Sequence, residues 1–201
     1  MRLERRHAIA WCLVTGLLAF GPAHGAKVLD ATLHRQGDTY QLDIRARIQA
    51  PEAAVRRIVT DYPHLSRLNP AIKSSKVLAV YGPGSSRVRT VTHACVLFFC
   101  KDIVQVQDVK VMPDGEVVAT TVPALSDFKS AVARWRLSRV GDATVMDFSA
   151  RFVPHFWVPP LIGPWLIRHK LSDEMAKTAE RIEQIANRDA DLDSSSGALS
   201  R

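Results

Sequence analysis

The chain has 201 residues, of which 47% are hydrophobic and 23% are charged, and its formal net charge at pH 7 is +7. This length predicts a single domain. The basic residues are scattered and no nucleic-acid-binding motif occurs, so a nucleic-acid partner is not expected. The modest positive charge suits either a surface that meets anionic lipid headgroups or ordinary solubility.

The first 25 residues differ in character from the rest of the chain. Basic residues open the segment, an apolar stretch follows over residues 8–20, and Ala23-His24-Gly25 places small residues at the positions that a signal peptidase recognises. This pattern predicts a secretory signal peptide at residues 1–25 and therefore an exported, periplasmic protein. The alternative is a transmembrane anchor, for which the apolar stretch is short.

Alternating apolar and polar residues predict the first strand. Residues 27–50 alternate in this way, and a turn at residues 36–38 divides the segment. Leu42 and Ile44 fall on the apolar face, while Asp43 falls on the other. This is the pattern of a half-buried antiparallel strand.

Three prolines shape the segment that follows. Pro51 suits the first turn of a helix. Pro63 ends that helix, because the residue before a proline is driven from helical geometry, and it also begins a second helix that Pro70 stops. We therefore expect two short helices, at an angle to each other, within residues 51–70.

A run of strands is expected next, separated by turns rich in glycine, proline or aspartate. The spacing of these turns is typical of an antiparallel meander. The expected strands cover residues 74–81, 87–94, 102–112, 116–122, 129–139 and 144–153.

Two cysteines outside the leader, Cys95 and Cys100, lie within this run. In an exported protein such a pair indicates a disulfide. On one continuous strand they would be roughly 16 Å apart, at about 3.3 Å per residue. A bridge needs Cα atoms within about 7 Å, so it requires a turn at residues 96–99 that closes a hairpin. The alternative is two buried free thiols in an irregular strand.

Helical spacing of apolar residues predicts one long amphipathic helix from about Pro160 to Asn187. The polar segment 188–201 is expected to be a disordered tail. A curved sheet of this size must bury its apolar face, and only the long helix can cover it. Where the sheet curves away from a single helix, a cavity is plausible.

The order of these elements, the long helix and the joint DYPHLSRLNPAIKSSKVL at residues 61–78 resemble the START-like superfamily, also called the helix-grip or Bet v 1-like fold. Within it, the likeness is to the branch of polyketide cyclase/dehydrase-like and coenzyme Q-binding proteins. The resemblance covers about residues 38–187. It implies an α+β helix-grip domain at residues 26–187, with a curved antiparallel sheet of about seven strands around the C-terminal helix. It also implies a hydrophobic ligand, such as a lipid, an isoprenoid quinone or a polyketide.

The sequence contains none of the common catalytic or metal-binding motifs. No histidine has zinc-type spacing, and neither G-x-S-x-G nor a phosphate-binding glycine loop occurs. We therefore expect a binding protein with no catalytic residue, metal or cofactor. One alternative is a cyclase or hydratase acting on a hydrophobic substrate, which needs a titratable group in the cavity. A second alternative is an accessory protein that binds an exported partner.

The apolar faces of the joint, the sheet and the long helix predict the wall of a ligand cavity. For Trp135 and Tyr62, simple packing of the core or of the joint is the alternative role. The predicted wall comprises Tyr62, Leu65, Trp135, Leu137, Phe148, Phe152, Leu171 and Met175.

Three connections are expected at one end of the sheet, because every second connection of an antiparallel meander lies at the same end. They span residues 96–99, 123–127 and 154–160, and they are unusually apolar for turns. An exposed apolar rim of this kind marks a partner or membrane contact, and we expect membrane docking. The alternative is that the loops fold inward and plug the end of the sheet. The predicted rim comprises Val96, Leu97, Phe98, Phe99, Leu125, Phe156, Trp157 and Val158.

Overall fold

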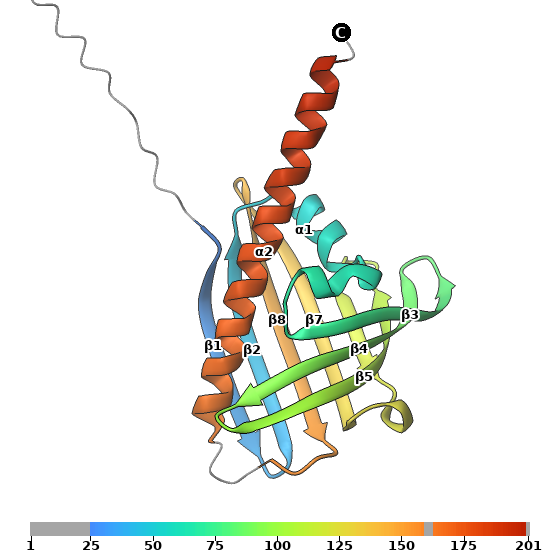
Figure 1. Cartoon of the computed structure of the whole chain (residues 1–201), viewed down its shortest axis with the longest axis vertical. Helices are drawn as coiled ribbons and strands as arrows, with labels where there is room; N and C mark the ends of the chain where they lie inside the picture. The colour runs from blue at the N-terminus through green and yellow to red at the C-terminus, as the bar shows by residue number, and fades with distance from the viewer. Residues whose placement is uncertain (1–24, 159–162, 200–201) are drawn as a thin grey trace, which may run out of the picture.

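The computed structural model describes residues 25–158 and 163–199, so almost all of the predicted signal peptide lies outside the described residues. The described part is an α+β fold with one sheet and one long helix (Figure 1). Its elements, in chain order, are β1 (Lys27–Gln36), β2 (Thr39–Ile48), α1 (Glu52–Val59), η1 (Tyr62–Arg67), β3 (Ile72–Gly82), β4 (Ser85–Val96), β5 (Phe99–Val111), β6 (Val117–Thr121), η2 (Pro123–Leu125), β7 (Phe128–Val140), β8 (Ala143–Pro154) and α2 (Pro164–Leu199).

The strands form one antiparallel sheet in the order β1-β2-β8-β7-β6-β5-β4-β3. The sheet curves around α2, which packs on β1 and β2 and touches β4 on the other side (Figure 1). This is the expected helix-grip arrangement. The sheet has eight strands rather than about seven, because the turn at Gly37, whose φ is +60°, separates β1 from β2 as a complete hairpin.

The two short helices predicted within residues 51–70 are present as α1 and the 3-10 helix η1, and η1 belongs to the joint that leads into β3. Asn69, just after η1, ties the joint to α2. Its Nδ2 donates hydrogen bonds to the backbone oxygen of Glu174 at 3.2 Å and to Oγ1 of Thr178 at 3.0 Å. The hydroxyl of Ser75 in β3 donates to the backbone oxygen of Tyr62. These bonds hold the joint across one end of the sheet.

Helix α2 differs from the prediction at both ends. It begins at Pro164 rather than Pro160, although residues 159–162 lie outside the described part. It continues to Leu199, so in the structure residues 188–199 extend the helix where the sequence favoured a disordered tail. No proline interrupts this polar segment, and Asp189 pairs with Arg57 of α1 at 2.9 Å. No helix within the described residues is long and apolar enough to cross a membrane.

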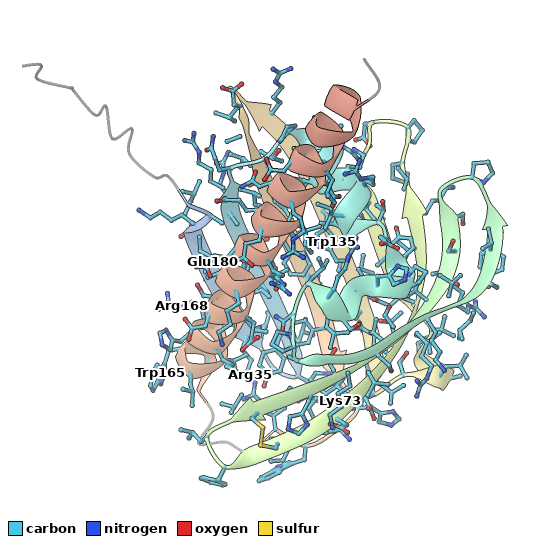
Figure 2. The ribbon with its side chains drawn as sticks, turned by 45° about the horizontal axis from the view of Figure 1, so that its top comes forward. Arg35, Lys73, Trp135, Trp165, Arg168 and Glu180 are labelled. Atoms are coloured by element: carbon cyan, nitrogen blue, oxygen red, sulfur yellow. A yellow bond between two sulfur atoms is a disulfide. The ribbon has the colours of Figure 1, made fainter. Side chains whose placement is uncertain are left out.

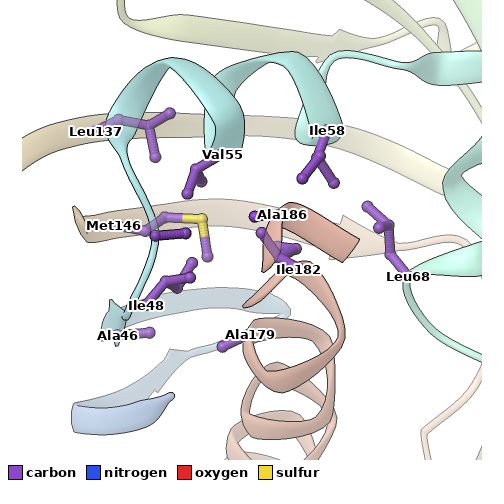
Figure 3. Close-up of a cluster of buried hydrophobic side chains, with 11 residues drawn as sticks. Ala46, Ile48, Val55, Ile58, Leu68, Leu137, Met146, Ala179, Ile182 and Ala186 are labelled. Atoms are coloured by element: carbon purple, nitrogen blue, oxygen red, sulfur yellow. The ribbon is translucent and has the colours of Figure 1, made fainter. Parts of the chain in front are cut away.

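The largest cluster of buried hydrophobic side chains among the described residues closes the end of the sheet that α1 covers (Figure 3). Ile48, Ile58 and Ile182 come from β2, α1 and α2, and their side chains are fully buried. Burying each such side chain contributes about 1.5–3 kcal/mol. The cluster comprises Ala46, Ile48, Ala50, Val55, Ile58, Leu68, Leu137, Met146, Ala179, Ile182 and Ala186. The two larger hollows between the sheet and α2 lie away from this cluster, while a smaller one is lined in part by its members Leu68, Met146 and Ile182.

Candidate ligand-binding cavity

Three adjoining hollows lie between the sheet and α2, and we call them the mouth, middle and inner sections. Their volumes are about 480, 370 and 190 Å³. The mouth and middle sections share Phe152 and Leu171, among others, while the middle and inner sections share Trp135 and Met175. Because neighbouring sections share wall residues, they adjoin one another, and together they make up the candidate cavity. Volumes of this order hold a drug-sized ligand.

The structure places seven of the eight predicted wall residues on this cavity. Tyr62 and Leu65 line the inner section, Trp135 and Met175 the inner and middle sections, Phe148 the middle section, and Phe152 and Leu171 the middle and mouth sections.

Leu137 is the predicted wall residue that does not line the cavity. It faces the same side of β7 as Trp135, but it is 8% exposed and packs within the closed core cluster. Helix α1 contacts β7 and fills the space that faces Leu137. The alternation of β7 therefore assigned the correct face to Leu137 but could not show that a helix covers that part of the face.

The mouth section has an aromatic wall that the sequence analysis missed in part. The ring of Tyr40 stacks on Phe152 with centroids 5.4 Å apart, and Phe128 meets Phe152 edge-on at 5.8 Å. Tyr40 shares the apolar face of β2 with Leu42 and Ile44, so its alternation in the sequence could have identified it. Phe128 stands at the first position of β7, and no local pattern distinguishes it from a loop residue.

Two tyrosine hydroxyls along the cavity have no hydrogen-bond partner in the part of the chain that the structure describes. They belong to Tyr62 in the inner section and to Tyr40 at the mouth, and both oxygens are buried. Burial raises the pKa of Tyr62, so its hydroxyl keeps its proton and can donate it. Buried hydroxyls normally have a partner, so these two are unusual, and neighbouring side chains that cover both oxygens would have to shift before a ligand could reach them.

The carboxylate of Glu174 on α2 borders the mouth and middle sections. Its burial alone would raise its pKa, but hydrogen bonds from Lys170 at 2.7 Å and Lys177 at 3.3 Å, with a contribution from Asn69, hold the pKa below its usual value. Glu174 is therefore ionised at neutral pH and its charge is compensated by two ammonium groups.

The other charged side chains of the wall are also paired. His93 Nδ1 lies 2.6 Å from Asp102, and Lys101 Nζ lies 3.7 Å from Asp127. Together with the Lys170–Glu174 pair, these account for every charged side chain on the three sections. Among the described residues, the titratable side chains of the cavity wall that lack a partner are therefore Tyr40 and Tyr62.

The predicted rim lies at the end of the sheet where α2 begins (Figure 1), and it divides into two groups. Four residues turn inward and line the mouth section: Val96, Phe99, Phe156 and Val158. Four are exposed: Phe98 by 86%, Trp157 by 69%, Leu97 by 65% and Leu125 by 51%. Both expected roles, an exposed rim and an inward plug, therefore occur in the same connections.

Exposed apolar side chains are not confined to this rim. In β3, beside the β3–β4 turn, Val80 is 71% exposed and Tyr81 is 56% exposed. Neither residue belongs to the predicted rim. They form a second exposed apolar site, away from the cavity mouth.

The predicted turn after Cys95 is present in the β4–β5 hairpin. Val96 pairs with Phe99, and Leu97 adopts a φ of 55°, which is unique among the non-glycine residues in the described ranges. Cys95 and Cys100 are directly opposite each other, with Cα atoms 4.1 Å apart and their sulfurs joined. Whether this bond forms in the protein's natural compartment stays a prediction.

Comparison with known proteins agrees with this architecture. A family described as "Polyketide cyclase / dehydrase and lipid transport" matches residues 40–186. No curated protein matches the sequence.

Several solved structures share the fold. A START superfamily protein from Mycobacterium smegmatis is 21% identical, with a TM-score of 0.60, over 72% of this chain and 98% of that one. The Zhui aromatase/cyclase from Streptomyces sp. R1128 is 13% identical, with a TM-score of 0.59, over 75% and 94%. A STAR-related lipid transfer protein fragment from Xanthomonas axonopodis is 13% identical, with a TM-score of 0.54, over 78% and 98%. With its family match spanning most of the domain and its helix-grip fold, this chain belongs to the polyketide cyclase/dehydrase and lipid transport family.

Proposed function

We propose that the protein is an exported carrier that holds a hydrophobic ligand in the cavity between the sheet and α2. The observation that carries this proposal is the candidate cavity itself, whose three sections share a mainly apolar wall. The family description, which includes lipid transport, supports a ligand of this class. The predicted signal peptide supports export.

The ligand that fits best has an apolar body and at least one hydrogen-bond acceptor. The apolar body suits the wall formed by Trp135, Phe148 and Met175. An acceptor on the ligand would satisfy the buried hydroxyls of Tyr62 and Tyr40 once the side chains that cover them shift, and an unpaired buried donor is costly. Lipids and isoprenoid quinones both combine these two features.

A carrier role fits the wall better than catalysis does. General acid–base catalysis needs a titratable side chain within hydrogen-bond reach of the substrate and poised to exchange a proton. The charged groups that border the cavity are paired with one another or with neighbours, as with Lys170 and Glu174. The second candidate, a polyketide cyclase, is favoured by the family description and by the protonated hydroxyl of Tyr62, which could polarise a substrate carbonyl.

The exposed part of the rim suits contact with a membrane from which a ligand enters. Phe98 and Trp157 present large apolar surfaces beside the mouth section. Trp165, 66% exposed, and Arg168 stand on the first turns of α2 at the same end (Figure 2). Aromatic side chains enter the interface of a bilayer, and nearby cations meet anionic headgroups.

Mass spectrometry of the molecules that co-purify with the protein tests this proposal. The full chain is expressed in a bacterial host and recovered from the periplasmic fraction, then extracted with organic solvent. We expect one defined class of apolar compound, near one equivalent per protein. Recovery from the cytoplasm alone would contradict export, and an empty protein would contradict the carrier. Chemical conversion of an added polyketide would favour the cyclase.

A further inference from the structure

Four side chains with metal-binding chemistry share the outer face of the β4–β5 hairpin. His93 and Cys95 stand two residues apart on β4, so they point to the same side. On β5, Asp102 lies directly opposite His93, and Cys100 lies directly opposite Cys95. The sulfur atoms are visible near the tip of the hairpin (Figure 2). The pairing of β4 with β5 therefore brings two cysteine side chains, an imidazole and a carboxylate together on one face of the hairpin.

The imidazole of His93 is oriented from both sides. Its Nδ1 lies 2.6 Å from Oδ1 of Asp102, while its Nε2 lies 3.3 Å from Sγ of Cys95. The other carboxylate oxygen of Asp102 accepts a hydrogen bond from Lys73 Nζ at 2.8 Å. A histidine that binds a metal through one ring nitrogen characteristically donates a hydrogen bond from the other nitrogen to a carboxylate. This bond orients the ring and makes the metal-binding nitrogen more basic.

The candidate ligand atoms are also close enough to share one ion. Nε2 or Nδ1 of His93 and the two sulfurs lie within 4.8 Å of one another. Zinc binds cysteine sulfur at about 2.3 Å and histidine nitrogen at about 2.0–2.1 Å in tetrahedral geometry, which brings neighbouring ligands within about 4 Å. The proposal requires the two sulfurs to move apart to that separation by side-chain rotation once they are no longer bonded to each other.

We propose that reduction of the Cys95–Cys100 bond creates a zinc site formed by His93, Cys95 and Cys100, with Asp102 positioning His93. Two thiolates and one imidazole are a ligand set that suits Zn²⁺. His93 and Cys100 are exposed, so the ion can enter from solvent and water can occupy a fourth position. Because His93 and Cys95 also border the mouth section, the site adjoins the entrance of the cavity.

The disulfide-bonded state and the zinc-bound state exclude each other, because both use the sulfurs of Cys95 and Cys100. A dithiol reductant transfers two electrons and two protons to the disulfide and becomes a cyclic disulfide, which leaves two cysteine thiols. Zn²⁺ then displaces the two thiol protons and forms two zinc–sulfur bonds. The site is therefore empty in the oxidised protein and available in the reduced one.

Titration with Co²⁺, which reports tetrahedral thiolate sites by its absorption, tests the proposal. The full chain carrying Cys12→Ser is used, so that Cys95 and Cys100 are the remaining cysteines. Thiol labelling under denaturing conditions first establishes the oxidised and reduced states. We expect the reduced protein to bind one equivalent of Co²⁺ with thiolate-to-metal absorption, and Zn²⁺ to displace it. The oxidised protein should show no such absorption.

Variants separate this site from adventitious binding. His93→Gln should weaken Co²⁺ binding by more than about tenfold, and Asp102→Asn by about 10–100-fold, as is typical of partners that orient a ligand. His64→Gln is the matched control, because His64 forms a similar pair with Asp61 at 2.9 Å on η1. It should leave binding unchanged.

Three outcomes would overturn the proposal. The first is a reduced, folded protein that gives no thiolate-to-cobalt absorption. The second is equal affinity before and after His93→Gln. The third is loss of the sheet signal in circular dichroism on reduction, because the site requires the hairpin to persist without its disulfide.

Discussion

Trp135 and Leu137 stand two residues apart on the same face of β7, yet they have different surroundings. Trp135 lines the inner and middle sections, and its ring lies 5.3 Å from that of Phe148. Leu137 packs in the closed core cluster beneath α1. The pair therefore allows the contribution of the cavity wall to be separated from that of the core.

We expect Trp135→Ala to weaken the binding of an apolar fluorescent probe at least tenfold, because the variant removes a large part of the wall. Its free energy of unfolding should fall by about 3–5 kcal/mol at most, since one side of the ring already faces a hollow. Leu137→Ala should lose about 2–5 kcal/mol and bind the probe as before. Probe titration and urea unfolding measure both quantities. Unchanged binding by a folded Trp135→Ala protein would exclude Trp135 from the site.

The ionisation of Glu174 makes part of the stability of the folded protein depend on pH. Its pKa in the folded protein is lower than the usual value of 4.5, because hydrogen bonds from Lys170, Asn69 and Lys177 outweigh its burial. The unfolded chain therefore takes up the proton first as the pH falls. The stabilisation is present above pH 4.5 and is lost as the pH falls through the pKa of the folded state.

We expect Glu174→Gln to lower the free energy of unfolding by on the order of 1 kcal/mol at pH 7, because charge-assisted hydrogen bonds are lost from a partly buried site. The difference between the wild type and the variant should shrink as the pH falls below 4.5. Urea unfolding over this range measures it. A difference that stays constant with pH would show that the ionisation of Glu174 does not contribute.

Among the elements, the β4–β5 hairpin combines exposure and backbone strain at its tip. Leu97 is 65% exposed and has a φ of 55°, a region that costs a residue with a side chain roughly 1–2 kcal/mol. Phe98, its neighbour in the turn, is 86% exposed. Glycine or asparagine would make this turn with less strain. Leu97 and Phe98 therefore do not stabilise this turn, and their exposed side chains suit contact with a membrane.

We expect the double variant Phe98→Glu with Trp157→Glu to reduce binding to anionic liposomes by at least tenfold. Each aromatic side chain that enters the bilayer interface contributes on the order of 1.5–3 kcal/mol, and each added carboxylate is repelled by the headgroups. Liposome co-sedimentation measures the loss, and circular dichroism reports the fold.

The matched control for this prediction is Val80→Glu with Tyr81→Glu, which makes the same charge change at the exposed apolar site on β3. It should bind liposomes far better than the rim variant. Equal binding by the wild type and the rim variant would rule out docking through the rim, while equal losses in both variants would indicate that only net charge matters.

At the scale of the whole molecule, the cavity follows from the unequal filling of the two ends of the sheet. At one end, α1 and the middle of α2 bury isoleucine and valine side chains against β2, β7 and β8 (Figure 3). At the other end, Ile167 and Leu171 of α2 pack against the side chains of β1, β2 and β8, while a hollow remains between α2 and the part of the sheet formed by β4 and β5. The mouth and middle sections therefore lie beside this second, smaller core.

The sequence by itself determined the elements and the faces that their residues occupy. Alternation and helical spacing are local properties, so they placed Trp135, Phe148 and Leu171 on the inward side without reference to the rest of the chain. The prolines of the joint and the turn signals of the meander are local in the same sense. The helix-grip fold follows from their order, because one long amphipathic helix must cover one curved sheet.

Only the tertiary structure decided what each inward residue meets. Leu137 and Trp135 have the same local pattern, and the position of α1 alone places one in the core and the other on the cavity. The orphan hydroxyl of Tyr62 and the grouping of His93 with Asp102 likewise depend on contacts between residues distant in sequence or on strand register. Those contacts arise when separate elements pack together, and a pattern within one element does not contain them.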